Sequence, residues 1–133
     1  MVYKQKSLFQ YVFDSSSLIW MERKSYMSCL RRRSAEVIVP EKVAEEVNTP
    51  GYPLERFLAH YPDVVTRLLP SEEDLYLEIR GQPGIHDGEA AAITLALSRG
   101  LPLIIDESQK RGRGKAENHG IHCLSWQEFV KGN

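Results

Sequence analysis

The hydrophobic residues of the chain follow two different spacings. Short apolar runs rich in β-branched and aromatic residues are typical of buried strands. They alternate with longer stretches whose apolar residues recur at three- and four-residue intervals, which is typical of helices. Pro40 and Gly100 mark helix boundaries, because Pro suits the first position of a helix and Gly the position after its end. The predicted strands are 11–13, 36–39, 64–69, 101–105 and 121–124, and the predicted helices are 15–33, 40–49, 52–61, 71–80, 88–99, 110–119 and 125–130.

This order of elements predicts the fold class. Strands separated by helices form βαβ units, in which the strands are parallel and the helices cover both faces of one sheet. We therefore expect an α/β fold with a parallel sheet. Ligands of such sheets bind outside the carboxyl ends of the strands, where the strand order reverses. Residues at those ends are the first candidates for a functional site.

The composition is that of one globular domain, which we expect to span residues 1–133. Hydrophobic residues make up 42% of the chain, which excludes a disordered tail. Lys and Arg total 17 and Asp and Glu total 18, which excludes a generally basic nucleic-acid coat. Cys29 and Cys123 form no CxxC motif, and the first residues carry no apolar signal segment, so we expect reduced thiols and a cytoplasmic protein.

Basic residues nevertheless gather in two runs, 31–33 and 110–115. A single basic run is most simply a solvated surface, whereas two such runs are also compatible with binding of a phosphate-rich partner. The second run directly follows Asp106, at the end of a predicted strand. Its candidates for contacts with a nucleic-acid backbone are Arg111, Arg113 and Lys115.

Two predicted strands end in an aspartate. Asp14 follows the strand at 11–13, and Asp106 follows the strand at 101–105. One such residue means little, because Asp is common in turns and helix caps. Two of them, on the two strands that look most buried, place two carboxyl groups at the same edge of the sheet.

Helical geometry adds two glutamates to this pair. At about 100° per residue, Glu46 flanks the apolar stripe of its helix and Glu45 points away from it. Glu89 falls inside the apolar arc of the next long helix, whereas Asp87 falls on the far side and suits an N-cap. Glu89 could simply complement the helix dipole in the first turn. A carboxylate on the face that meets the sheet is costly, however, unless it is paired or bound to a cation.

Four carboxylates at one edge of a sheet would repel one another. A single pair about 5 Å apart at an effective dielectric of about 20 costs roughly 3 kcal/mol. No Lys or Arg stands at an equally obvious inward position in the sequence. A bound divalent cation would relieve the repulsion, and a set of oxygen ligands suits Mg²⁺ or Mn²⁺ rather than zinc.

The residues around these acids resemble the motifs of PIN-domain nucleases. The segments 12–19 and 37–47 are similar to the first half of such a domain, and 87–93 and 103–107 to the second half. The order and spacing of the four segments are more specific than any one of them. The resemblance is to prokaryotic PIN proteins of the VapC toxin type, and it extends from about Val12 to Phe129.

The resemblance implies a three-layer α/β/α fold and metal-dependent cleavage of RNA. It implies a small antitoxin as a possible partner and a homodimer as the assembly. A hydroxyl at Ser16, two positions after the first aspartate, matches a residue that the family often carries. The acids that the resemblance assigns to catalysis and to the metal are Asp14, Glu46, Glu89 and Asp106.

Two other functions are compatible with parts of the pattern. A phosphoacceptor domain also places Asp at strand ends, but it normally has paired acids after the first strand, where this chain has Asp14 followed by serines. A PIN-like module that binds nucleic acid or protein without cleaving it would share the fold. The roles of Asp87, Glu107 and His86 stay open.

Overall fold

The computed structural model describes residues 9–106 and 110–132, and for Lys110 and Arg111 the backbone alone. Its centre is a five-stranded sheet in the order β3-β2-β1-β4-β5, in which each pair of neighbouring strands is parallel. The α/β fold with a parallel sheet is thereby confirmed. The strands are β1 (Tyr11–Phe13), β2 (Val37–Pro40), β3 (Val65–Thr66), β4 (Leu103–Ile104) and β5 (Cys123–Leu124).

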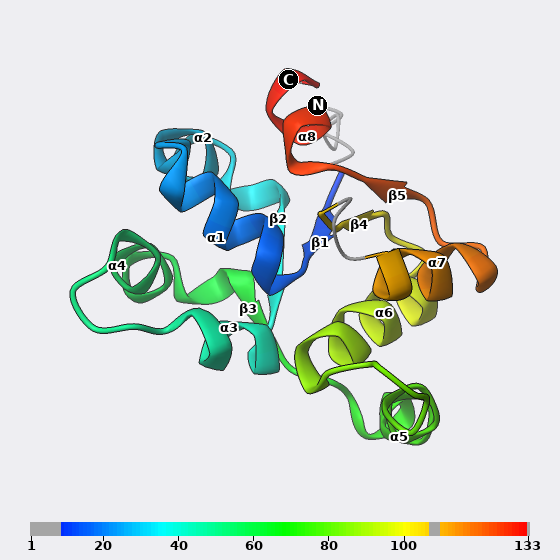
Figure 1. The fold of residues 1–133 in the computed structure, drawn as a ribbon. Helices are drawn as coiled ribbons and strands as arrows, with labels where there is room; N and C mark the ends of the chain where they lie inside the picture. Colours follow the sequence, from blue (N-terminus) through cyan, green and yellow to red (C-terminus); the bar gives the residue numbers. More distant parts are fainter. Residues whose placement is uncertain (1–8, 107–109, 133) are drawn as a thin grey trace, which may run out of the picture.

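Helices cover both faces of the sheet, which gives three layers (Figure 1). One core lies between the sheet and the helices of the first half together with the last helix, and the second core lies between the sheet and the helices from residue 73 to 118. The helices are α1 (Ser15–Arg23), α2 (Met27–Arg32), α3 (Glu41–Val47), α4 (Pro53–His60), α5 (Glu73–Arg80), α6 (Asp87–Arg99), α7 (Lys110–Asn118) and α8 (Trp126–Lys131), with short 3₁₀ turns at η1 (Ser34–Glu36), η2 (Pro62–Val64) and η3 (Pro70–Glu72).

Successive residues of the central strand serve different cores. Phe13 is buried against the α1 and α8 side, and Val12 is buried against the α6 side. Because side chains alternate across a strand, a strand buried on both faces has no polar position, which is why the run over 11–13 is continuously apolar.

The strand order reverses beside β1. The chain passes from β1 to β2 and β3 on one side, and then crosses back through α5 and α6 to β4 on the other side. In the β1–β4 pair, Phe13 lies opposite Ile104, and the Asp14 amide donates to the Ile104 carbonyl at 3.1 Å. The reversal therefore falls where a parallel sheet offers a binding crevice.

The predicted helix over 15–33 is wrong in its length, because it is broken in two. Ser25 adopts a left-handed φ of 67°, and the Tyr26 amide donates back to the Met21 carbonyl at 2.8 Å. The turn redirects the chain so that Met27 and Leu30 of α2 are buried in the same core as α1. Left-handed φ is uncommon outside Gly, so a serine at this position does not indicate a helix break.

Two predicted helix starts also differ from the structure. Pro40 is the last residue of β2 and pairs with Thr66, and α3 begins one residue later. Ser71 does not cap α5, because it lies within η3. The stop at Gly100, with a left-handed φ of 65°, and the N-cap at Ser125, whose hydroxyl accepts from the Glu128 amide at 3.1 Å, are both confirmed.

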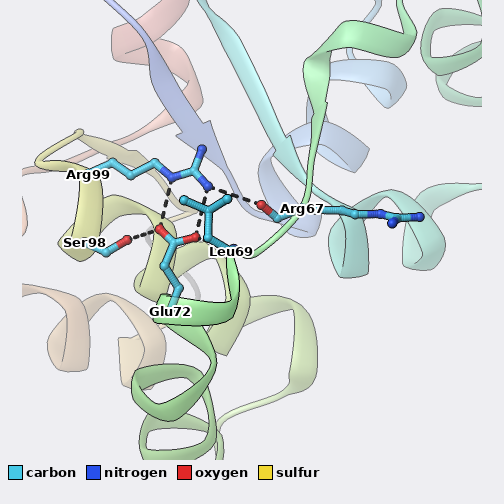
Figure 2. A network of polar contacts seen from close by, with 5 residues as sticks. All are labelled: Arg67, Leu69, Glu72, Ser98 and Arg99. Atoms are coloured by element: carbon cyan, nitrogen blue, oxygen red, sulfur yellow. Dashed lines mark hydrogen bonds and ion pairs between the residues drawn. The ribbon is translucent and has the colours of Figure 1, made fainter.

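An ion pair between a half-buried arginine and a buried glutamate joins η3, directly before α5, to the end of α6 (Figure 2). Arg99 donates to both carboxylate oxygens of Glu72 at 3.0 Å, and Ser98 and the Leu69 amide also donate to this carboxylate. These donors, Arg99 first, lower the pKa of Glu72 to about 2 although the side chain is buried. The same guanidinium reaches the Arg67 carbonyl at 3.2 Å and so holds the edge of the sheet to α6.

Cys29 and Cys123 are both buried and free. No helix within 9–106 and 110–132 has the length and apolar composition that crossing a bilayer requires.

Candidate active site

Asp14 lies at the carboxyl end of the central strand and is 2% exposed. Its Oδ1 accepts from the Ser17 amide at 3.0 Å, which makes it the N-cap of α1, and its Oδ2 accepts from the Ser16 hydroxyl at 2.8 Å. Burial, together with a smaller contribution from the charge of Glu89, raises the pKa of Asp14 to about 6 in spite of these two hydrogen bonds. The ionised carboxylate is therefore held in place but poorly compensated.

Glu89 enters the same region from the first turn of α6. It is 8% exposed, whereas Asp87 is exposed and pairs with Arg80, so the predicted register of this helix is confirmed. Arg80 also lowers the pKa of Asp87. The N-cap itself is His86 rather than Asp87, and Glu89 Oε1 accepts from the His86 amide at 3.2 Å.

Glu46 reaches this region from α3. Its side chain is exposed as a whole, like that of Glu45, but its carboxyl group lies against Gly88 at the start of α6. Partial burial of this carboxyl group raises the pKa of Glu46, the charges of Asp87 and Glu89 raise it further, and His86 opposes them. The contact with α6, and not burial of the whole residue, distinguishes Glu46 from Glu45.

Asp106 is the second residue after β4 and is half-buried. Because Ile104 pairs with Phe13, Asp106 lies at the same edge of the sheet as Asp14. Electrostatic repulsion links Asp14 to Glu89 and Glu89 to Glu46. Acids from β1, α3, α6 and the segment after β4 thus lie at one edge of the sheet.

A cleft of about 600 Å³ lies beside Glu46. Both acidic and basic side chains line this cleft, and the basic ones come from α3 and α5. The residues that line it are Lys42, Glu45, Glu46, Arg80, Gly84, Ile85, His86 and Asp87. His86 thus opens onto the cleft next to an acid of the site.

The family follows from a comparison of the whole sequence. Residues 10–124 match a family model described as a PIN domain. This chain belongs to the PIN-domain family. The matched segment contains all four acids and every strand of the sheet. PIN domains are in general nucleases, so this PIN domain is a nuclease-like module. A comparison with curated proteins gives no match.

The acids of this PIN domain fit a divalent cation in their chemistry. Carboxylate oxygens are hard donors, and a buried carboxylate whose neighbour is another acid gains from a bound cation. Their side chains are not gathered as closely as the ligands of an occupied metal site. Among the residues that the structure describes, no group of three His, Cys, Asp or Glu side chains is close enough to hold one ion.

The basic run of this PIN domain has a structural component. Arg113 Nη2 donates to the Cys123 carbonyl at 3.3 Å, and its Nε lies 3.4 Å from Glu117, so this side chain holds α7 against β5. Lys115 is half-buried. The Arg111 side chain and the whole of Glu107 lie outside the described residues. In the other run, Arg33 is buried and pairs with Glu36 at 2.9 Å.

Two glycines complete the surroundings of the acids, and sequence reasoning missed them. Gly88 lies against the Glu46 carboxylate, and Gly112 lies against the Glu89 carboxylate. Glycine inside a helical pattern can signal close approach of the backbone. In the sequence, however, Gly112 looks only like a residue that weakens α7.

Proposed function

We propose that this PIN domain is a metal-dependent endoribonuclease that uses Mg²⁺ or Mn²⁺. The observation that carries the proposal is Asp14, a buried carboxyl group with a pKa near 6 at the end of the central strand, with an acid as its electrostatic neighbour. An uncharged Asn or Ser could cap α1 as well as Asp14 does, and the charged form is destabilising at this buried position, so capping alone does not account for an acid here. The proposed ligands and catalytic acids are Asp14, Glu46, Glu89 and Asp106.

The chain's own contribution is to hold these carboxylates in fixed orientations. Ser16 and the Ser17 amide each bind one oxygen of Asp14. The His86 amide binds one oxygen of Glu89. Such hydrogen bonds to ligand carboxylates orient them toward a cation. Ser16 therefore acts in support of Asp14 and not as a reacting group.

A cation bound by these acids would lower the pKa of the attacking water and stabilise charge on the leaving oxygen of a phosphodiester. The chain would also have to hold the substrate backbone. Arg111, Arg113 and Lys115 on α7 are proposed for that role because α7 begins close after Asp106. RNA, rather than DNA, is proposed from the resemblance to VapC-type toxins.

The same resemblance supports a narrower biological role. In that role the protein is the toxin of a toxin–antitoxin pair, forms a homodimer and is covered by a small antitoxin. Growth arrest on expression, relieved by an Asp14→Asn substitution, would be expected of such a toxin. Normal growth of cells that contain active protein would contradict the toxin role and leave the nuclease proposal intact.

A PIN-like module without catalysis is the second candidate. The observation that favours it is the open arrangement of the acids, of which no described trio is close enough to hold an ion. Such a module would bind RNA with or without a divalent cation and would leave it intact. Chelator-sensitive cleavage separates the two candidates.

The test compares two neighbouring glutamates. Purified wild type, Glu46→Gln and Glu45→Gln are incubated with single-stranded RNA of mixed sequence and Mn²⁺, with and without EDTA. We expect wild-type cleavage that EDTA abolishes, a loss of at least about tenfold in Glu46→Gln, and near wild-type activity in the Glu45→Gln control. Absence of EDTA-sensitive cleavage by the wild type would refute the nuclease, and equal losses in both variants would refute the specific role of Glu46.

A further inference from the structure

Each glutamate of the candidate site lies directly against the Cα of a glycine on a neighbouring helix. A Cβ atom at Gly88 would lie 2.8 Å from Cδ of Glu46, and a Cβ atom at Gly112 would lie 3.1 Å from Cδ of Glu89. In both cases a carboxylate oxygen would be closer still. The contacts connect α3 to α6 and α6 to α7, so the spacing of three helices depends on positions without a side chain.

The reason for glycine at these positions is space rather than backbone conformation. Gly88 and Gly112 lie within α6 and α7, where glycine costs up to about 1 kcal/mol relative to alanine. The glycines with positive φ lie elsewhere, in turns such as that at Gly100. Glycine at these positions is therefore unfavourable for the helix itself, and the close contact with a carboxylate explains why glycine is there.

The two contacts differ in how easily they could adjust. Glu46 is exposed, so its carboxylate could move into the cleft beside it if Gly88 gained a methyl group. Glu89 is buried, and the His86 amide binds it at 3.2 Å. The same Cβ at Gly112 would also lie 3.2 Å from Cδ1 of Ile105, a buried core residue. Glu89 therefore has little room to yield.

We infer that Gly112 is a positioning residue for Glu89, and this inference rests on the proposed nuclease function. The bare backbone of α7 and the His86 amide together set where the Glu89 carboxylate lies at the acidic edge of the sheet. Any side chain at position 112 would displace this carboxylate. The cation affinity of the site then depends on a residue that has no ligand atom.

Gly114 provides a matched control two residues further along α7. A Cβ atom there would meet nothing within 4 Å. Both positions lie in the same helix, so alanine improves helix propensity similarly at each. A difference between Gly112→Ala and Gly114→Ala therefore reports the contact with Glu89 and not the helix.

The experiment measures thermal unfolding in EDTA and in increasing Mn²⁺. In EDTA we expect Gly114→Ala to melt at or above the wild-type Tm, and Gly112→Ala to melt roughly 3–6 °C below Gly114→Ala. In Mn²⁺ we expect the Kd from the Tm shift to rise about tenfold or more in Gly112→Ala and to stay at the wild-type value in Gly114→Ala.

A shorter acid at position 89 distinguishes displacement of the carboxylate from a general loss of stability. Glu89→Asp withdraws the carboxylate by one methylene, so Gly112→Ala should lose less Tm and less Mn²⁺ affinity in the Glu89→Asp background than in the wild type. Equal losses in both backgrounds, or a Gly112→Ala variant that behaves like Gly114→Ala, would overturn the inference. A wild type without any Mn²⁺-induced shift would instead overturn the proposed function, and the EDTA measurements would still decide the contact.

Discussion

Replacing Asp14 by Asn separates the charge of this carboxyl group from its role as a helix cap. Burial raises the pKa of Asp14 from 3.8 to about 6. Because a tenfold change in proton affinity corresponds to about 1.4 kcal/mol, the ionised group destabilises the metal-free fold by about 3 kcal/mol. Asn has the same shape, carries no charge and caps helices as well as Asp does.

The sign of the pH dependence follows from proton linkage. The folded protein binds the Asp14 proton more tightly than the unfolded chain, so this group's contribution to the free energy of unfolding falls as the pH rises from about 4 to about 6. Above that range the contribution stays low. In EDTA at about pH 7.5, Asp14→Asn should therefore be more stable than the wild type by up to about 3 kcal/mol, with a difference that vanishes near pH 4.

A divalent cation should reverse this order. The wild type should gain about 2.7 kcal/mol at a hundredfold excess of Mn²⁺ over Kd, and Asp14→Asn should gain much less because a ligand charge is missing. RNA cleavage should be abolished in the variant although it is folded.

Urea unfolding at several pH values, in EDTA and in Mn²⁺, measures these differences. Subtracting the variant from the wild type cancels the titration of other acids such as Glu72, and the exposed Asp63→Asn serves as the control that should change neither stability nor cleavage. An Asp14→Asn protein with wild-type stability at every pH, in both buffers, would refute the reasoning and leave Asp14 as a helix cap only.

Three further outcomes are expected from features outside the acidic edge. Arg99→Ala should destabilise the fold by about 2–3 kcal/mol in urea unfolding, because it leaves the Glu72 carboxylate buried without its guanidinium partner. The difference in stability between the wild type and this variant should decrease as the pH drops from about 4.5 towards 2 and Glu72 becomes protonated. Arg113→Ala should lower the Tm, because it removes the contact between α7 and β5. Lys115→Ala should leave the Tm unchanged and reduce the slope of log K for RNA binding against log salt concentration by about 0.7. An unchanged slope would show that Lys115 does not contact the RNA. Ser125→Ala should cost about 1 kcal/mol, measured by urea unfolding, since this hydroxyl caps α8.

Hydrophobic patterning was most informative for the central strands, because these strands are buried on both faces. Val12 and Phe13 pack into opposite cores, so β1 is a continuous apolar run that stands out from the helices. The break between α1 and α2 was not predictable in the same way. It depends on a left-handed Ser25, whose residue type carries no turn signal as strong as that of Gly.

In the candidate site, too, local features were predictable from the sequence and contacts between separate helices were not. Which face of α6 carries Glu89 follows from helical periodicity, which is a local property. The contact of Glu46 with Gly88 depends on how closely α3 and α6 approach, and the use of Arg113 to hold β5 depends on where α7 docks. Distances between separate helices are set by the packing of the whole fold, and a single sequence does not give them.

The central position of β1 has a consequence for how the protein folds. Its two neighbours are β2, which follows closely in the chain, and β4, which is separated from β1 by most of the sequence. Pairing of β1 with β2 closes a short loop, whereas pairing with β4 closes a long one and is expected to be the slower event. Asp14 and Asp106 are therefore expected to reach the same edge of the sheet late, so a partly folded or incompletely synthesised chain would lack the assembled acidic edge. If the proposed nuclease activity holds, it would therefore arise only once the domain is essentially complete.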